Sequence, residues 1–327
     1  MKKIIPPKLK RGDEIRVISP ARSMKIISAE SQNIAKKRLF NLGFKVTYGK
    51  HVNEYDELAS SSIESRIRDL HEAFLDKNVK AILTTIGGFN SNQLLNYIDW
   101  DIINNNPKVF CGYSDITSIS NAILKKTGLV SYYGPHYSSF GQELYFDYTL
   151  EYFRKCLLST QPFELVASRE WSDDAWYKDQ SDRKLITNKG WVIINQGETQ
   201  GTIIGGNLCT LNLLQGTEYF PNLEKTILFI EDDSDSSANV FDRDLQSLIH
   251  LPDFFKVKGL VIGRFQKKSK ISINILNKII CKKELKNIPI VANLDFGHTD
   301  PKMTLPIGGT AIIDTQGAKP AIRILEH

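Results

Sequence analysis

The sequence lacks the long apolar segments that mark membrane and secreted proteins. No run in its 327 residues is apolar for the length of a membrane span. The N-terminus is positively charged, but Pro6 and Pro7 follow before an apolar run develops. We therefore expect neither a membrane-spanning helix nor a secretory signal, and no membrane partner.

Cysteine is scarce, and the histidines are scattered. The four cysteines form no Cys-x-x-Cys pair, and the six histidines form no His-Glu-x-x-His pattern. These absences argue against the usual zinc motifs, and nothing else predicts a metal site or a cofactor. The cysteines lie in apolar or helical surroundings, which is typical of buried free thiols in a reducing compartment. We expect a cytoplasmic protein.

The chain also lacks a strong excess of charge of one sign. Its 42 basic and 37 acidic residues give a net charge of +5. The densest basic stretch, residues 267–286, is interleaved with isoleucine and leucine, as on the solvated face of a helix. We expect no nucleic-acid polymer as a partner. A hydrophobic content of 41% suffices for a full core, and the length favours two domains.

The first half of the chain alternates between strand and helix patterns. Helical patterns end near residue 42 and cover residues 63–74, 92–98 and 115–126. Strand patterns cover residues 14–19, 44–48, 79–85 and 109–112. This alternation predicts an α/β domain over residues 1–160, with a mostly parallel sheet flanked by helices as in Rossmann or flavodoxin-like folds. Sites in such sheets form at the carboxyl ends of the strands.

The second half is richer in short strands. A polar and aromatic segment, residues 161–189, has no clear period and is interpreted as a linker and substrate loop. Residues 190–327 then form a smaller strand-rich domain with a helix near 239–250 and a lysine-rich helix further on. Its strand patterns cover residues 191–195, 201–204, 226–231, 257–263, 289–293, 310–314 and 321–325.

Two segments at predicted strand ends carry groups suited to catalysis. Ser114 and Asp115 follow an apolar strand and open a helix, so backbone N–H groups and the helix dipole lie where negative charge could be stabilised. Ser and Asp are also ordinary helix N-caps, which is the simpler interpretation. Gly87 and Gly88 follow another strand and either free N–H groups for a ligand or form a plain turn. No P-loop lysine follows them.

A serine nucleophile needs a base and a group that orients that base. Glu231 ends an apolar strand, and His298 lies in a loop directly after another strand. Each is, by itself, an ordinary strand terminus or loop residue. With Ser114 they repeat the nucleophile, acid and base order of strand-end triads.

Four segments together resemble the signatures of the L,D-carboxypeptidase family of serine peptidases. The likeness extends from Lys8 to the C-terminus, whereas the general α/β-hydrolase elbow needs a glycine where Ile116 stands. The four segments are Gly-Tyr-Ser-Asp at 112–115, Ile-Gly-Gly-Asn-Leu at 204–208, Phe-Ile-Glu-Asp at 229–232 and Gly-His-Thr at 297–299.

The resemblance implies a role for each of these residues. Ser114 is then the nucleophile, His298 the general base and acid, and Glu231 the carboxylate that orients the imidazole. The backbone N–H groups of Gly88 and Asp115 form the oxyanion hole in a groove between the domains. The family resemblance also implies a homodimer.

Two branches of the family differ in substrate. One releases the terminal D-alanine of muropeptides, and the other, the microcin-immunity branch, cleaves aminoacyl-nucleotide amides such as aspartyl-adenylate analogues. The loop tryptophans, Trp171 and Trp176, and the acidic run 231–236 favour the immunity branch, with Trp176 preferred for stacking on the base. Both indoles are equally compatible with sealing a domain interface.

Two further residues are expected to line the substrate cleft. They are Gly87 and Asn207, and Asn207 is equally compatible with a turn. Muropeptide L,D-carboxypeptidase is the alternative activity. A non-catalytic two-domain binding protein is the alternative of another class.

Overall fold

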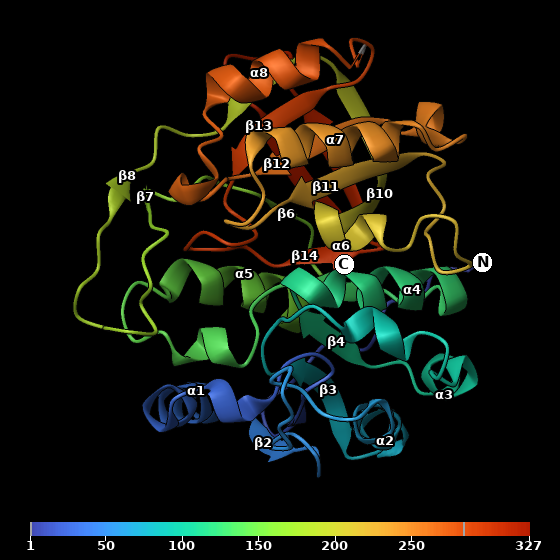
Figure 1. Ribbon diagram of the computed structural model, residues 1–327, viewed down its shortest axis with the longest axis vertical. Coiled ribbons are helices and arrows are strands. Elements are labelled where there is room, and N and C mark those ends of the chain that lie inside the picture. The colour runs from blue at the N-terminus through green and yellow to red at the C-terminus, as the bar shows by residue number, and fades with distance from the viewer. Residues whose placement is uncertain (1, 284) are drawn as a thin grey trace.

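The computed structural model describes residues 2–283 and 285–327 and contains two large sheets, one above the other in Figure 1, and a third sheet of two short strands. The first sheet has the order β14-β5-β4-β3-β1-β2, and all its neighbours are parallel except β14 and β5. Its strands are β1 (Glu14–Ile18), β2 (Lys45–Tyr48), β3 (Val79–Thr84), β4 (Val109–Gly112), β5 (Ser131–Tyr133) and β14 (Leu305–Ile307). The predicted parallel sheet is confirmed.

Helices flank this sheet and bury one apolar stripe each. In α2, for example, Leu70 and Phe74 are fully buried, while the Ser62 hydroxyl caps the helix by accepting from the N–H of Ser65. The α-helices are α1 (Ala29–Asn41), α2 (Ile63–Leu75), α3 (Trp100–Asn105), α4 (Thr117–Thr127) and α5 (Asp147–Leu158). Short 3₁₀ turns are η1 (Met24–Ile26), η2 (Ser91–Leu94), η3 (Ser114–Ile116) and η4 (Ser138–Gly141).

The second sheet has eight strands in the order β6-β16-β15-β10-β11-β12-β13-β9, with β10 to β13 parallel. They are β6 (Phe163–Glu164), β9 (Val192–Asn195), β10 (Glu198–Asn207), β11 (Thr226–Glu231), β12 (Gly259–Gly263), β13 (Ile290–Leu294), β15 (Thr310–Asp314) and β16 (Ala321–Glu326). Its helices are α6 (Leu208–Asn212), α7 (Ala238–Ile249) and α8 (Ile273–Cys281), with 3₁₀ turns η5 (Phe254–Lys256) and η6 (Lys267–Ser269). The predicted strand-rich second unit is confirmed.

One strand from the last part of the chain joins the first sheet, and the two sheets share a packed interface. Strand β14 comes from the last part of the chain but pairs with β5 of the first sheet. Tyr133 of β5, Phe229 of β11 and Phe296 belong to one cluster of buried residues between the sheets. This packing holds the carboxyl ends of strands from both sheets against one another. The chain limits proposed for the domains, 1–160 and 190–327, stay a prediction.

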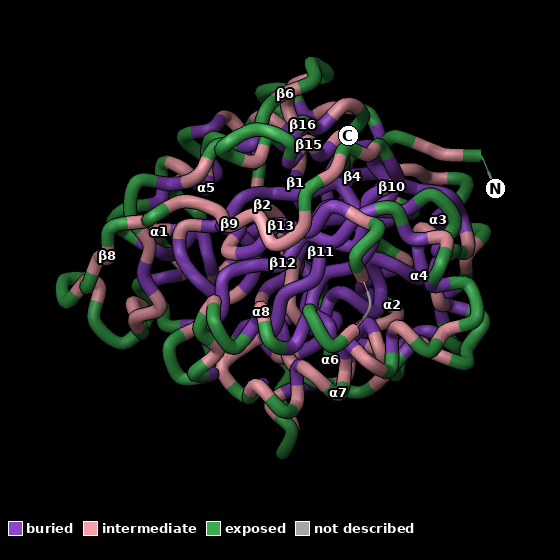
Figure 2. Tube along the Cα trace, turned by 90° about the horizontal axis from the view of Figure 1, so that it is seen from above, coloured by how far each residue is buried: buried purple, intermediate pink, exposed green. Residues whose placement is uncertain are grey.

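The segment between the two units runs along the side of the molecule (Figure 1). Within it, β7 (Glu170–Trp171) and β8 (Ile186–Thr187) form a small hairpin. Figure 2 shows this edge mostly exposed or half-buried around a buried centre. In the described part of the chain, no helix combines the length and apolarity needed to cross a bilayer.

All four cysteines are free, but only two are buried. Cys111 and Cys156 lie in the core, whereas Cys209 and Cys281 are exposed. The expectation of buried thiols is therefore wrong for the latter two. Both lie on helices, on the faces that reach solvent. Apolar neighbours in the sequence do not show which face of a helix a cysteine occupies.

Candidate active site

Ser114 occupies the sharp turn between β4 and α4. Its φ of 61° lies in the left-handed region, which non-glycine residues rarely adopt. Such backbone strain is concentrated at functional sites because the surrounding structure must impose it. The turn places the hydroxyl of Ser114 at the carboxyl end of the first sheet, where the second sheet meets it.

The side chains of Ser114, His298 and Glu231 form a continuous chain of hydrogen bonds. His298 Nε2 lies 3.0 Å from Ser114 Oγ, and His298 Nδ1 lies 2.8 Å from Glu231 Oε2. Glu231 ends β11 and is fully buried. Gly297, with a φ of 92°, precedes the histidine, and a Cβ there would collide with the Glu231 carboxyl group. The structure therefore brings these three residues together across the interface of the sheets.

The environment of His298 favours its charged form. Burial lowers the pKa of the imidazole, but the charge and hydrogen bond of Glu231 outweigh burial, so the pKa of His298 is raised above its usual 6.5. A base that is strengthened in this way accepts a proton from a hydroxyl more readily.

Tyr133 contacts the residues at both ends of this hydrogen-bond chain. Its hydroxyl donates to Glu231 Oε1 at 2.6 Å and accepts from the backbone N–H of Ser114 at 3.0 Å. Burial raises the pKa of Tyr133 well above 10, so the phenol remains a donor. Sequence reasoning missed this residue because a tyrosine in an apolar strand is indistinguishable from a core aromatic. Its strand, β5, was also not among the predicted strands, so the position of Tyr133 at a strand end gave no signal.

The Gly87–Ser91 segment is fastened to the turn at Ser114. Asp115 Oδ2 accepts from the backbone N–H groups of Asn90 at 3.1 Å and Ser91 at 2.9 Å. A Cβ added at Gly87 would lie 3.0 Å from Ser114 Oγ, so this backbone touches the hydroxyl. Gly88 and Asp115, the predicted oxyanion donors, both line a small cavity that also includes Ser114.

A cavity of about 450 Å³ opens beside Ser114 and His298. Trp176 lines this cavity, as does Gly87. The loop that carries Trp176 is held by Arg183, whose Nε lies 2.9 Å from Asp174 Oδ1. The other lining residues include Arg22, Tyr113, His136, Asp174, Asp300 and Lys302.

Trp171 does not line this cavity. Its ring packs against the guanidinium of Arg264 at 4.9 Å and the ammonium of Lys267 at 5.7 Å, beside a different depression. Asn207 caps α6 by accepting from the N–H of Thr210 and also lines the small cavity that includes Ser114 and Asp115. Of the predicted substrate residues, the structure therefore brings Gly87, Trp176 and Asn207 to Ser114, and not Trp171.

Several charged or titratable residues of the cavity beside Ser114 were missed from the sequence, among them His136 and Lys302. His136 Nδ1 lies 2.6 Å from Thr84 Oγ1, while Nε2 is buried without a partner. Burial, with His298 nearby, lowers the pKa of His136 well below 6.5, so the ring is neutral. Lys302 forms an ion pair with Asp300. Neither lies in a recognisable motif, although His136 follows a strand end.

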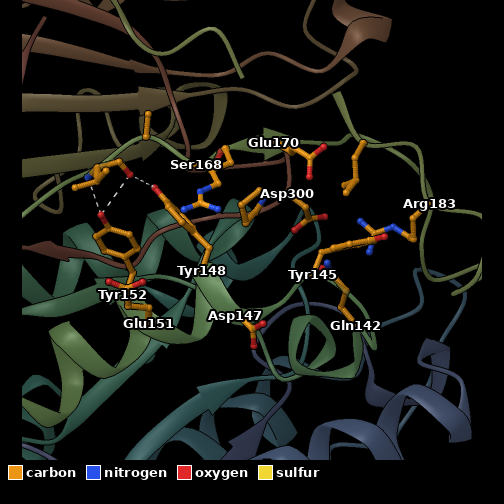
Figure 3. Close-up of a pocket in the computed structure, with 15 residues that line it drawn as sticks. Gln142, Tyr145, Asp147, Tyr148, Glu151, Tyr152, Ser168, Glu170, Arg183 and Asp300 are labelled. Atoms are coloured by element: carbon orange, nitrogen blue, oxygen red, sulfur yellow. Dashed lines mark hydrogen bonds between the residues drawn. The ribbon is translucent and has the colours of Figure 1, made fainter. Parts of the chain in front are cut away.

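A neighbouring cavity of about 500 Å³ lies between α5 and the loop after β6 (Figure 3). It does not include Ser114, His298 or Glu231, but Asp300 lines both cavities. Arg183 lies over the ring of Tyr145, 5.6 Å from its centroid, in this region. These contacts tie the loop that carries Trp176 to the first domain.

Matches to family models and to carboxypeptidase-named relatives define the class of the protein: the chain is a serine peptidase of the carboxypeptidase type, a hydrolase. Residues 15–134 match the LD-carboxypeptidase N-terminal domain, and residues 200–313 match the LD-carboxypeptidase C-terminal domain. The chain belongs to the LD-carboxypeptidase family, which confirms the resemblance seen in the sequence.

Named relatives of the chain include carboxypeptidases and an immunity protein. The putative carboxypeptidase YocD of Bacillus subtilis (strain 168) is 58% identical, over 98% of this chain and 99% of its own. The microcin C7 self-immunity protein MccF of Escherichia coli is 33% identical, over 88% of each chain.

Solved structures of similar proteins superpose closely. An MccF-like protein from Bacillus anthracis str. Ames has a TM-score of 0.98 and 56% identity, covering 99% of this chain and 100% of that one. MccF in complex with aspartyl sulfamoyl adenosine has a TM-score of 0.90 and 32% identity, covering 99% of each chain.

Proposed function

We propose that this chain hydrolyses the amide-type bond of aminoacyl-nucleotides, with Ser114 as nucleophile. The observation that carries the proposal is the hydrogen-bond chain from Ser114 Oγ through both nitrogens of His298 to Glu231, with distances of 3.0 and 2.8 Å. The hydroxyl, imidazole and carboxylate stand in the order that serine hydrolysis requires.

The proposed reaction has two steps, acylation of Ser114 and hydrolysis of the acyl-enzyme. His298 takes the Ser114 proton as Oγ attacks the substrate carbonyl, and the backbone N–H groups of Gly88 and Asp115 stabilise the oxyanion. The imidazolium, held by Glu231, then gives its proton to the leaving nitrogen as the carbon–nitrogen bond breaks. A water molecule, deprotonated by the same imidazole, attacks the acyl-enzyme, and the proton returns to Ser114 as the acid leaves.

The substrate class is supported by Trp176 and by the relatives. The Trp176 indole lines the cavity on the His298 side of Ser114, where a planar base can stack on it. At about 450 Å³, the cavity lies in the range of small-molecule sites. Since MccF binds an aminoacyl sulfamoyl nucleotide, we favour a nucleotide-linked substrate over a muropeptide. A role in self-immunity or detoxification follows from this substrate class.

We further propose a cytoplasmic homodimer. The dimer rests on the family resemblance, and the cytoplasmic site rests on four cysteines that are all free. Sedimentation velocity should give a mass near twice the 37.1 kDa of one chain. A single species at the monomer mass across the working concentration range would overturn the dimer.

The function is tested with two substrates and one variant. The wild-type protein and Ser114→Ala are incubated with an aminoacyl-adenylate amide and, separately, with a muropeptide tetrapeptide. We expect nucleotide release by the wild type alone. D-alanine release with an intact adenylate would establish the muropeptide activity instead. Turnover that survives Ser114→Ala would exclude Ser114 as the nucleophile, and absence of turnover with binding retained would leave a binding protein.

A further inference from the structure

Two cavities with different linings meet at Ser114, and the chemistry assigns one half of the substrate to each. The larger is lined by His298 and Trp176, whereas the smaller, of about 170 Å³, is lined by Gly88 and Asp115. In serine hydrolysis the histidine protonates the leaving group, which must lie on its side. On the basis of the proposed function, the acyl group therefore lies toward the smaller cavity.

The smaller cavity is strongly acidic. Among its described lining residues are four aspartates and no lysine, arginine or histidine. The aspartates are Asp115, Asp232, Asp233 and Asp235. Asp115 is already engaged by backbone N–H groups, and Asp235 pairs with Lys268 at 3.1 Å in solvent, where such pairs are weak. The net field at the acyl position is negative.

Asp232, like Asp115, is buried, but it lacks a full set of hydrogen-bond partners. Only 2% of the residue is exposed. Its Oδ1 accepts from Asn207 Nδ2 at 3.2 Å and from the N–H of Asp233 at 3.1 Å, but Oδ2 is buried without a hydrogen bond. The Ser236 hydroxyl lies near enough to lower the pKa of this carboxyl, yet the two groups do not reach hydrogen-bond geometry.

Burying a carboxylate costs free energy unless a cation or a hydrogen-bond donor pairs with it. Burial, reinforced by the neighbouring Glu231 charge, raises the pKa of Asp232 to about 7. A bound ammonium group would supply both the missing donor and the missing positive charge. The hydrolytic steps do not use Asp232, and while its Oδ1 holds Asn207 and the Asp233 N–H, its Oδ2 is left for a ligand.

We infer that the small cavity is an acyl-side subsite for a substrate ammonium group, and that the chain prefers neutral or basic aminoacyl groups to acidic ones. The volume of about 170 Å³ corresponds to about five or six water molecules. It thus accommodates one amino-acid residue. A carboxylate side chain at this position would face the like charge of Asp233 and, wherever Asp232 is ionised, that of Asp232 as well.

Equilibrium binding tests the inference separately from catalysis. The Ser114→Ala protein is titrated calorimetrically with three sulfamoyl adenosines: lysyl, Nε-acetyl-lysyl, which lacks the side-chain ammonium group, and aspartyl. We expect the lysyl compound to bind at least about tenfold more tightly than either of the others. Asp232→Asn, combined with Ser114→Ala, should remove most of that preference, whereas Asp253→Asn, an exposed control in the same unit, should retain it.

The outcomes separate the two proposals. Equal binding of the three compounds, tighter binding of the aspartyl compound, or no binding at all would overturn the ammonium subsite. Preferential lysyl binding by Ser114→Ala, together with no turnover of a lysyl-adenylate amide by the wild type, would overturn the hydrolytic function alone. If Asp232→Asn does not fold, as judged by circular dichroism, Asp235→Asn at an exposed position repeats the test.

Discussion

The Tyr133 hydroxyl donates a 2.6 Å hydrogen bond to Glu231, which links the two sheets at the reacting side chains. The same oxygen accepts the backbone N–H of Ser114. The carboxylate that orients His298 and the strained turn that presents Ser114 are thus fixed by one phenol. Residues of the first sheet therefore fix both ends of the hydrogen-bond chain, because Ser114 follows β4 and Tyr133 of β5 holds Glu231. Glu231 and His298 themselves belong to the second part of the sequence.

Tyr133→Phe should impair both stability and activity. The variant leaves a Glu231 oxygen and the Ser114 N–H without partners, which should lower the free energy of unfolding by about 1–3 kcal/mol. Without its donor, Glu231 should stabilise the imidazolium further, so the acid limb of the pH–rate profile should move to higher pH. Urea unfolding and kcat/KM against pH measure the two effects.

Tyr132→Phe is the matched control, because Tyr132 is buried in the same strand but faces the opposite side. It should leave the pH–rate profile unchanged. If both variants shift the pH–rate profile equally, the effect of Tyr133→Phe comes from altered packing and not from the lost hydrogen bonds to Glu231 and Ser114.

In the acid range the rate should depend on the protonation state of His298. Only the neutral imidazole can accept the Ser114 proton, and the pKa of His298 is raised above 6.5. Activity should therefore be lost as pH falls, with a midpoint above 6.5. The measurement is kcat/KM between pH 5 and 9. A midpoint below 6.5 would contradict the influence assigned to Glu231.

Gly87→Ala should disable the site without unfolding the protein. Gly87 does not have a positive φ, but an added Cβ would lie 2.9 Å from Ser114 Cβ and 3.0 Å from Oγ. Displacing the nucleophile should lower kcat/KM about a hundredfold. Gly317→Ala, where the nearest atom lies 3.6 Å away, is the control. Wild-type kinetics in Gly87→Ala would show that this loop does not approach Ser114 in solution.

The two loop tryptophans should behave differently. Trp176→Ala should weaken binding of an adenylate substrate by about 1–3 kcal/mol, because it removes a stacking surface beside Ser114. Trp171→Ala should leave KM unchanged, because its ring packs on Arg264 and Lys267. Steady-state kinetics on both variants decide this, and equal KM increases would place both rings in the site.

Much of the fold was predictable because its strands are continuous apolar runs ended by clear stops. Strand β4 and helix α4 follow from Val109–Gly112 and from the helical period after it. Strand β14 was missed, since Leu305–Ile307 contains a proline and pairs only with a distant partner. Non-local pairing leaves no periodic signal in so short a segment.

The site was predictable only where chemistry and strand ends coincide. Glu231 ends a strand, and Ser114 and His298 come shortly after strands, so their convergence could be anticipated. The roles of Tyr133 and His136 depend on which way each side chain points, which alternates along a strand and depends on its pairing. Trp176 was preferred to Trp171 from the sequence, but only the path of the loop shows that Trp176 lines the cavity beside Ser114 and that Trp171 lines another depression.

The most direct test of the hydrolytic account is covalent labelling of Ser114. The protein is incubated with a fluorophosphonate that reacts with activated serines, and peptide mass spectrometry locates the adduct. We expect a single phosphonyl adduct on Ser114 in the wild type and none after His298→Ala. Unlabelled Ser114, or an adduct that forms equally well without His298, would contradict the claim that His298 activates this hydroxyl.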